Sequence, residues 1–147
     1  MGITEEKKPY SLRTCRHIRN DVLNFLGGLM FDILGVYLVD FKINIGGEFN
    51  GKHYAVILSE LSCKDKTLLA APITSKKKGT KYRGGFTIEC NKYQANPTCE
   101  KAFVKVRKIR EIHRSRIFGN KIYDLDNEDK QKLIDSIKKT IKIFDDE

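Results

Sequence analysis

Short apolar runs separated by turn-forming residues are the feature that most restricts the fold of this chain. Five runs rich in β-branched and aromatic residues follow one another: VYLVDF, HYAVILSE, TLLAAPIT, FTIEC and AFVKV. Runs of this length, bounded by glycine-rich or lysine-rich segments such as NIGGEFNGK and SKKKGTKYRGG, predict strands joined by turns. Several short consecutive strands predict an antiparallel sheet that curls into a small barrel.

Helical periodicity appears at the two ends of the chain. From residue 11 to residue 30, apolar side chains recur every three or four positions, which predicts an N-terminal helix. Asp126 or Asn127 is the candidate cap of a C-terminal helix. Its apolar stripe comprises Leu133, Ile134, Ile137, Ile141 and Phe144. The segment IREIHRSRIF, which precedes this helix, fits a strand and a short helix equally. The expected fold class is mainly β with helices, of the α+β type.

The composition is that of one globular domain. With 147 residues, 40% of them hydrophobic and 32% charged, the chain can bury a core and is too polar for a membrane protein. Asp32 and nearby glycines interrupt the longest apolar run, near residues 25–39, before it could span a bilayer. The N-terminus mixes acids with bases and lacks the apolar stretch of a signal peptide, so we expect a cytoplasmic protein.

The cysteines and histidines do not form a metal-binding pattern. The four cysteines, at positions 15, 63, 90 and 99, have no CxxC pair and no zinc-ligand spacing. In a reducing compartment they are expected to be core-filling thiols. The three histidines have no accompanying carboxylate motif. We therefore expect neither a metal site nor a cofactor.

Positive charge is concentrated in the middle of the chain. The net charge is +9, and residues 74–84 hold five basic residues and no acid. Residues 101–121 hold eight basic residues and one acid, whereas residues 126–147 are acidic by seven to five. A basic surface attracts polyanions, so nucleic acid, an acidic protein and an anionic membrane surface are candidate partners. Solvated lysines on an ordinary surface are the alternative for either cluster alone.

Four ordered segments carry a resemblance to a known family. The chain contains VYLVDF, GGEFNGKHYAVILS, LLAAPITSKKKG and FVKVRKIREIHRSRIFG, which resemble, in this order and with these gaps, the MazF/PemK toxins of bacterial toxin–antitoxin systems. The match covers roughly residues 33 to 144. It divides the chain into an N-terminal helical extension, residues 1–32, and a MazF/PemK-like barrel domain with a C-terminal helix, residues 33–147.

The resemblance implies a fold, an activity and partners. The implied fold is an SH3-like antiparallel β-barrel that forms a homodimer. The implied activity is that of an mRNA interferase, a metal-independent, sequence-selective endoribonuclease that needs no cofactor. It cuts single-stranded RNA to 2′,3′-cyclic phosphate and 5′-hydroxyl ends. The implied partners are single-stranded RNA and a small acidic antitoxin protein, with no membrane partner; the basic clusters suit both, because RNA and a carboxylate-rich peptide are anionic.

The family's catalytic motifs match this chain in part. The family pattern Gly-x-Arg-Pro reads GKHY here, so His53 stands where the catalytic arginine is expected. The family's catalytic threonine is matched by Thr74 within PITS. An imidazole transfers protons near neutral pH, since its ordinary pKa is about 6.5. The resemblance therefore makes His53 and Thr74 the catalytic candidates.

Eleven further side chains are candidates for RNA binding. Basic groups attract phosphates, and aromatic rings stack on bases. By the resemblance, Lys105 falls where one branch of the family has a catalytic arginine, Arg110 is retained, and an aspartate has become His113. Phe41 is an additional candidate for stacking. The eleven are Glu48, Phe49, Lys52, Ser75, Lys76, Lys77, Tyr82, Arg83, Lys105, Arg110 and His113.

Three functions fit these residues. An active endoribonuclease is favoured by Thr74 and by a histidine in place of the arginine. A catalytically inactive relative that only binds RNA or an acidic antitoxin-type partner is favoured by the loss of that arginine, and a lone histidine at a strand start is more often structural. A DNA-binding or gyrase-inhibiting toxin is the third, since related barrels carry different functions. The endoribonuclease is the leading hypothesis.

Overall fold

The computed structural model describes residues 30–46 and 50–144. Within these ranges, seven strands precede one α-helix: β1 (Gly35–Asp40), β2 (Lys52–Ile57), β3 (Thr67–Ser75), β4 (Gly85–Glu89), β5 (Lys101–Lys105), β6 (Arg110–His113), β7 (Ile117–Asp124) and α2 (Asn127–Thr140). The five apolar runs of the sequence are confirmed as the first five strands. The predicted N-terminal helix, apart from Met30, and the candidates Glu48 and Phe49 fall outside the described residues.

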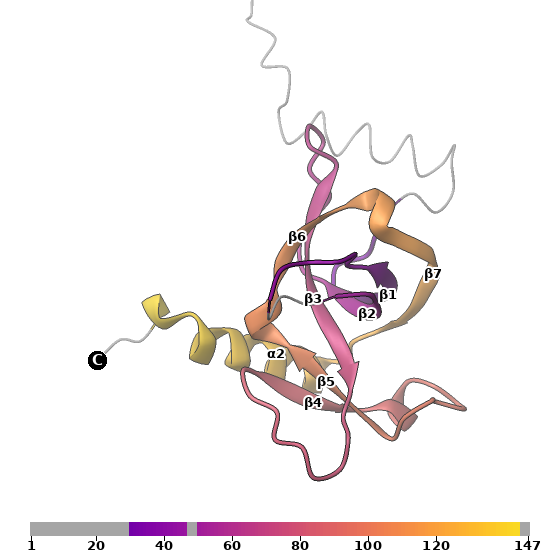
Figure 1. Ribbon diagram of the computed structural model, residues 1–147, viewed down its shortest axis with the longest axis vertical. Helices are drawn as coiled ribbons and strands as arrows, with labels where there is room; N and C mark the ends of the chain where they lie inside the picture. Colours follow the sequence, from indigo (N-terminus) through magenta and orange to yellow (C-terminus); the bar gives the residue numbers. More distant parts are fainter. Residues whose placement is uncertain (1–29, 47–49, 145–147) are drawn as a thin grey trace, which may run out of the picture.

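The strands form one antiparallel sheet (Figure 1). Their order is β4-β5-β3-β2-β1-β7, and β6 pairs separately with β3. On the edge away from β2, the long strand β3 has two partners: residues Ile73–Ser75 pair with β5, and residues Thr67–Ala70 pair with β6. In Figure 1 the segment from β6 to β7 arches around β1 and β2. No pairing between described residues joins β4 to β7, so closure into an SH3-like barrel stays a prediction.

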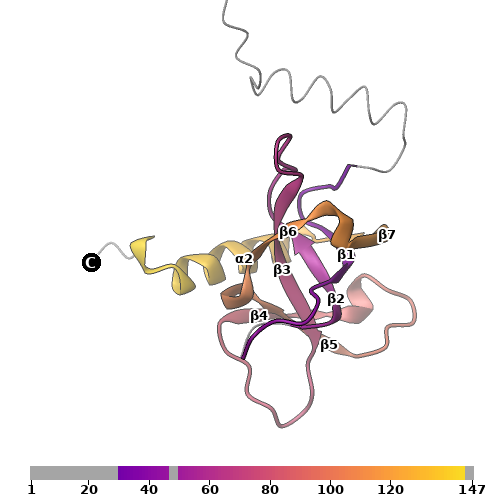
Figure 2. The ribbon, with the colours of Figure 1, turned by 45° about the horizontal axis from the view of Figure 1, so that its top comes forward.

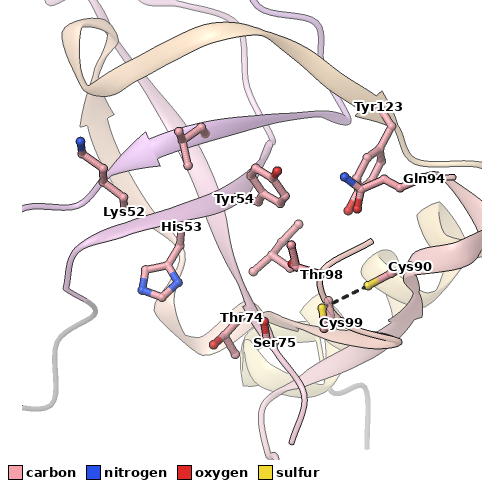
Figure 3. Close-up of a pocket in the computed structure, with 13 residues that line it drawn as sticks. Lys52, His53, Tyr54, Thr74, Ser75, Cys90, Gln94, Thr98, Cys99 and Tyr123 are labelled. Carbon is pink, nitrogen blue, oxygen red and sulfur yellow. Dashed lines mark hydrogen bonds between the residues drawn. The ribbon is translucent and has the colours of Figure 1, made fainter. Parts of the chain in front are cut away.

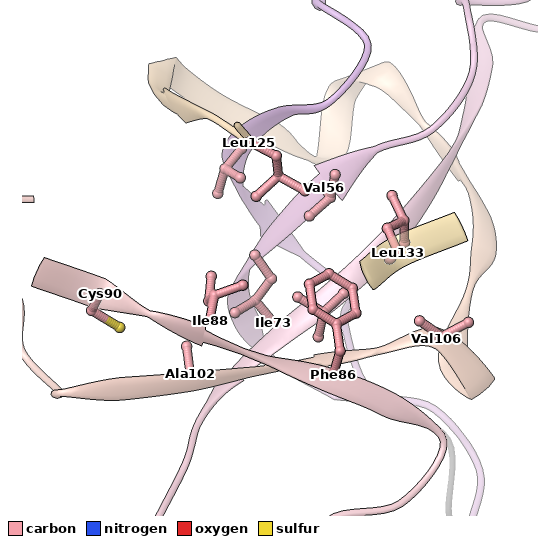
Figure 4. Packing of buried hydrophobic residues seen from close by; sticks show 12 residues of the cluster. Val56, Ile73, Phe86, Ile88, Cys90, Ala102, Val106, Leu125 and Leu133 are labelled. Atoms are coloured by element: carbon pink, nitrogen blue, oxygen red, sulfur yellow. The ribbon is translucent and has the colours of Figure 1, made fainter. Parts of the chain in front are cut away.

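Two clusters of buried side chains cover the two faces of the central strands. The first lies between the sheet and α2, where Figure 4 shows Val56 and Phe86 close to Leu133 of the helix. The second lies on the other face and consists of Tyr37, Val39, Phe41, Ala55, Ile57, Leu68, Ala70 and Ile112. Because neighbouring residues of a strand point to opposite faces, strands β1 to β3 contribute side chains to both clusters. Their sequences are therefore nearly continuous apolar runs.

Two expectations about side chains are corrected by the structure. Phe41 is fully buried in the second cluster, so it offers no surface for base stacking. Cys90 and Cys99 are free thiols, buried and half-buried respectively, whereas Cys63 is disulfide-bonded. The prediction of free thiols is therefore wrong for Cys63, because sequence spacing carries no information about which sulfurs folding brings together.

Helix α2 begins where the sequence predicts and ends earlier. Asp126 is the N-cap, because its side chain accepts a hydrogen bond from the backbone N–H of Asp129 at 2.9 Å. The helix buries Leu133 in the first cluster and lies beside β4 (Figure 2). The backbone becomes extended at Ile141, so Ile141 and Phe144 lie beyond the helix and are not part of its stripe. In the described ranges, no helix is long and apolar enough to cross a membrane.

The ambiguous segment IREIHRSRIF contains β6, a 3₁₀ turn (Arg114–Arg116) and the start of β7. The sequence did not predict β7, whose side chains are mostly exposed. This strand joins the sheet by backbone pairing with β1, with a register shift between Val36 and Leu38. Backbone pairing at a solvated edge leaves no apolar pattern in the sequence.

Candidate nucleic-acid interface

The two catalytic candidates lie opposite each other on neighbouring strands. β2 and β3 pair with Tyr54 opposite Ile73, and the same register continued by one residue places His53 opposite Thr74. Thr74 is in turn paired with Phe103 of β5. Residues directly opposite each other in a sheet point to the same face. His53 and Thr74 therefore share one surface.

The half-buried position of His53 changes its protonation. Burial disfavours the charged imidazolium and lowers the pKa of His53 below its ordinary value of 6.5. A hydrogen bond with the backbone of Asn50 acts in the opposite direction, and the positive charge of Lys105 lowers the pKa further. The imidazole is therefore mainly neutral at pH 7 and can accept a proton.

A cavity of about 260 Å³ lies at this end of β2 and β3 (Figure 3). Besides His53 and Thr74, its lining includes Lys52, Tyr54, Ser75, Gln94, Thr98 and Tyr123. Figure 3 shows the side chains of Tyr54, Gln94 and Tyr123 around one space, while the imidazole of His53 leaves the other side of β2. His53 of β2 and Thr74 of β3 thus lie on one face of the sheet, and Tyr54, Gln94 and Tyr123 surround a space on the other.

The loop at residues 90–100, which forms one wall of the cavity, is fixed to α2. Tyr93 stacks on Tyr123 with ring centroids 4.5 Å apart. The Tyr93 hydroxyl donates to the carboxylate of Asp129, which is 1% exposed. Burial is the main cause that raises the pKa of Tyr93, so its hydroxyl stays protonated. Lys92 adds an ion pair with Asp129 at 3.5 Å. These contacts make the wall and the start of α2 one structural unit.

The lining residues Tyr54, Gln94, Thr98 and Tyr123 were not among the sequence candidates. Gln94 and Thr98 belong to a loop without a recognisable motif, and Tyr123 belongs to the unpredicted strand β7. The one usable signal was an aromatic residue, Tyr54, next to His53 in the strand. These four residues come together through contacts between segments that are distant in the sequence, and a local sequence pattern cannot predict such contacts.

Tyr82 holds the basic loop that follows β3. Its hydroxyl accepts a hydrogen bond from the backbone N–H of Lys77 at 2.9 Å and donates one to the carbonyl of Ser75 at 3.1 Å. Its ring centroid lies 5.1 Å from that of Phe103. Because Phe103 is paired with Thr74, Tyr82 fixes the loop at the edge of the candidate site.

Basic side chains line two hollows beside this loop. The first is lined by Lys76, Lys77, Lys78 and Lys101, and the second by Lys81, Arg83, Lys105, Arg107 and Lys108. The ammonium of Lys76 donates to Oγ1 of Thr87 at 2.8 Å. At the other border, Lys52 lies over the ring of Phe118, 5.5 Å from its centroid. Most of the predicted RNA-binding residues therefore surround the His53 end of the sheet.

Arg110 and His113 lie at the other end of β3. Arg110 is paired with Ala70, four residues before Thr74, which corresponds to about 13 Å along the strand. His113 is paired with Thr67, which is about 23 Å from Thr74 on the same basis. Within one copy of the chain, the structure does not bring these two residues to the catalytic candidates His53 and Thr74.

The exposed ring of His113 serves the local backbone. Its Nδ1 accepts a hydrogen bond from the backbone N–H of Ser115 at 3.1 Å and lies 2.8 Å from the Ser115 hydroxyl. The side chain therefore caps the 3₁₀ turn at residues 114–116. This arrangement gives His113 a structural role in the described part of the chain.

The His53 end of the sheet offers proton-transfer, hydroxyl and ammonium groups. Among the described residues, no three His, Cys, Asp or Glu side chains are placed to share a metal ion. The groups that the structure does place together are the imidazole of His53, the hydroxyls of Thr74 and Ser75, and the ammonium of Lys105. A neutral imidazole can take a proton from a hydroxyl, and hydroxyl and ammonium groups can stabilise charge on a phosphate.

Comparison with known proteins identifies the family. Residues 34–141 match the PemK-like, MazF-like toxins of type II toxin–antitoxin systems. MazF (Form-I) from Deinococcus radiodurans has a similar structure, with a TM-score of 0.60 and 19% identity over 77% of this chain and 97% of that chain. The Mycobacterium tuberculosis toxin MazF-mt6 gives a TM-score of 0.53 and 14% identity over 74% and 96%. No curated protein matches the chain in sequence. The chain belongs to the PemK/MazF-like family of type II toxins.

Proposed function

We propose that this chain is an endoribonuclease that cuts single-stranded RNA without a metal ion. The observation that carries the proposal is the register of β2 and β3, which sets the half-buried His53 opposite Thr74 when it is continued one residue beyond the pair Tyr54–Ile73. Burial lowers the pKa of His53, which favours its neutral form at pH 7. Family membership supports it, since toxins of this family are generally endoribonucleases. The surrounding basic side chains support an anionic substrate.

In the proposed mechanism, His53 is the general base. Its neutral imidazole takes the proton of an RNA 2′-hydroxyl, and the 2′-oxygen attacks the adjacent phosphorus. Thr74 donates a hydrogen bond to a phosphate oxygen as negative charge develops there. The bond from phosphorus to the 5′-oxygen then breaks, and this oxygen takes a proton, for which we propose Lys105 as the donor. The products are a 2′,3′-cyclic phosphate and a 5′-hydroxyl.

The remaining nearby candidates are proposed to bind RNA. They are Lys52, Ser75, Lys76, Lys77, Tyr82 and Arg83. Because lysine and arginine contacts to phosphate release counterions, the affinity for RNA should fall steeply as the salt concentration rises. Glu48 and Phe49, in the loop before β2, stay predictions. Arg110 and His113 are left out of the site of one copy.

The proposed partners follow from membership in a type II toxin family, which pairs a toxin with an antitoxin. We propose that the antitoxin is a small acidic protein whose carboxylates occupy the same basic surface as RNA. We also propose that the chain acts as a homodimer in the cytoplasm. Competition between RNA and an acidic peptide for this surface would support the shared site.

A second candidate function is a catalytically inactive module that binds RNA or the antitoxin. The observation that favours it is the replacement of the family's catalytic arginine by His53. An inactive module needs the basic surface alone, whereas an enzyme also needs the His53 imidazole. The two functions are therefore separated by cleavage and not by binding.

The deciding experiment is cleavage of a long single-stranded RNA by the purified chain in the presence of a chelator, with the new ends mapped. We expect site-specific cuts with 5′-hydroxyl and 2′,3′-cyclic phosphate ends. His53→Ala should cut about 100- to 10,000-fold more slowly, the usual contribution of a general base. His53→Arg, which restores the family residue, is the matched variant. RNA that is bound and never cut would establish the inactive module, and unchanged cutting by His53→Ala would move the base elsewhere.

A further inference from the structure

A pair of free cysteines lies in the wall of the cavity next to His53. Cys90 follows β4 directly, and Cys99 lies two residues before β5. Their sulfur atoms are 3.5 Å apart, and this contact is drawn as a dashed line in Figure 3. Both side chains line the cavity. The proposed reaction uses neither thiol.

The backbone around the two cysteines already has the geometry of paired strands. β4 ends and β5 begins with Glu89 opposite Lys101. Beyond this pair, the backbone N–H of Cys90 donates to the carbonyl of Glu100 at 3.0 Å, and Cys99 is the next residue along. A disulfide holds its sulfurs about 2.05 Å apart. Side-chain rotation with a small shift of the loop is therefore sufficient to join them.

The two thiols differ in access. Cys99 is half-buried and borders the cavity, so a small reagent can reach its sulfur. Cys90 is 4% exposed, and burial, followed by the hydrogen bond with Cys99, raises the pKa of Cys90 to about 12. The thiolate is the nucleophile in thiol–disulfide exchange. Cys99 is therefore the first thiol to react, and Cys90 is the second.

We propose that Cys90 and Cys99 form a thiol–disulfide modification site that accepts a low-molecular-weight disulfide of the oxidised-glutathione class and weakens RNA binding when oxidised. In the first step, the Cys99 thiolate attacks one sulfur of the reagent, a mixed disulfide forms, and one reagent thiol leaves. In the second step, Cys90 loses its proton and attacks the Cys99 sulfur, which releases the second thiol. Two protein thiols are oxidised to one disulfide, and the reagent disulfide is reduced to two thiols.

Closing this bond changes the cavity. The loop between the two cysteines carries Gln94 and Thr98, which both line the cavity. Drawing the Cys99 sulfur toward Cys90 moves the neighbouring Thr98 inward and ties the two ends of the loop together. Tyr93 and Lys92 attach the loop to Asp129 of α2. The whole loop therefore cannot move together with the Cys99 sulfur, and its shape has to change. The oxidised chain therefore binds and cuts RNA less well, a consequence that rests on the proposed function.

The test uses the full chain, first reduced and then exposed to oxidised glutathione. Remaining thiols are blocked with N-ethylmaleimide, and unreduced peptides are mapped by mass spectrometry. We expect a link between the peptides that contain Cys90 and Cys99. We also expect RNA cleavage and RNA binding to weaken by about tenfold, a usual size for coupling between two sites. Addition of a reducing agent should restore both.

Two variants serve as controls. Cys99→Ser removes the first reacting sulfur, so its cleavage of RNA should not respond to glutathione, whereas Cys63→Ser keeps the pair and should respond like the wild type. Absence of the Cys90–Cys99 link, or a linked chain that binds and cuts RNA as well as the reduced chain, would overturn the proposal. A reduced chain that cuts no RNA, but whose RNA binding weakens on linkage, supports the modification site and contradicts only the endoribonuclease activity.

Discussion

The two ends of β3 carry similar residues in different surroundings. One end has Thr74 opposite His53, and the other has Thr67 paired with His113. At the first end, the histidine and the threonine are half-buried and border a cavity. At the second end, Thr67 donates to the carboxylate of Glu111 at 2.9 Å, and the exposed His113 caps a turn. Local partners therefore account for the polar groups of the second end.

The comparison shows that burial and neighbours, rather than residue type, distinguish a candidate catalytic histidine from a structural one. In the sequence, each histidine lies next to a basic residue, Lys52 or Arg114, and only the family resemblance singles out His53. In the structure, burial and Lys105 shift the pKa of His53, whereas His113 binds Ser115. Perturbed ionisable groups at a cavity are typical of functional sites. The His53 end is therefore the one to test.

The largest contrast is expected from removing one hydroxyl at each end. Thr74→Val removes the proposed donor to the phosphate, so RNA cleavage should fall about 100- to 1000-fold, as when one donor of an oxyanion hole is lost. Thr67→Val removes only the hydrogen bond to Glu111 and should leave cleavage unchanged. The rate of cleavage of one defined RNA measures both. If both variants lose cleavage activity equally, the two hydroxyls support the folded structure, and Thr74 has no separate role at the phosphate.

A smaller contrast is expected in the pH dependence of cleavage. Because the pKa of His53 lies below 6.5, the base stays neutral and active at pH 6.5, and the rate should fall about tenfold per pH unit only below the shifted pKa. The same sign applies to stability: the contribution of His53 is complete above about pH 6.5 and is lost as the pH falls through the lower, folded-state pKa. Rate and urea-unfolding profiles from about pH 4.5 to about pH 8 measure the two effects.

Lys105→Met sharpens the pH experiment. The variant should cut RNA more slowly, since Lys105 is the proposed proton donor. Removing its positive charge should also raise the pKa of His53 and move the acid limb of the remaining rate profile to higher pH. Lys64→Met removes an equal charge from the turn near the other end of β3 and should leave the limb in place. If the acid limb of Lys105→Met lies at the same pH as that of the wild type, the charge of Lys105 does not affect the pKa of His53.

The smallest effect is expected at the His113 end. His113→Ala removes the acceptor that caps the turn at residues 114–116, which should lower the free energy of unfolding by about 0.5–1 kcal/mol. Asparagine is also a good cap, so His113→Asn should keep most of the stability. Urea denaturation measures the change, and RNA cleavage should stay at the wild-type rate. If both variants lose most of their cleavage activity, His113 takes part in the RNA site, and a second copy of the chain must bring it there.

The strands and the helix cap could be predicted because local chemistry determines them. Between its two threonines the run TLLAAPIT is apolar, since most of this part of β3 is buried, and Asp126 precedes a helix whose first turn is acidic. Thr74 and His53 were found through the family resemblance. Their placement on one surface then required the pairing of β2 with β3, which the structure supplies.

The parts that escaped prediction depend on contacts between distant segments. The strand β7 is held by its backbone, and its exposed side chains follow no apolar period. Gln94 and Thr98 reach the cavity because Tyr93 anchors their loop to Asp129 of the helix. The apolar stripe predicted for α2 continues in the sequence to Phe144, but the extended backbone at Ile141 ends the helix. None of these events has a signal within a window of a few residues.

The burial of β2 changes along its length, from the exposed Lys52 through the half-buried His53 and Tyr54 to the buried residues 55–57. The buried end anchors the strand in both hydrophobic clusters, whereas at the other end only Tyr54 packs against the first cluster. Replacement of a side chain at position 53 therefore changes the available chemistry at small cost to folding. Such a strand can carry side chains of different chemistry at position 53 on the same scaffold.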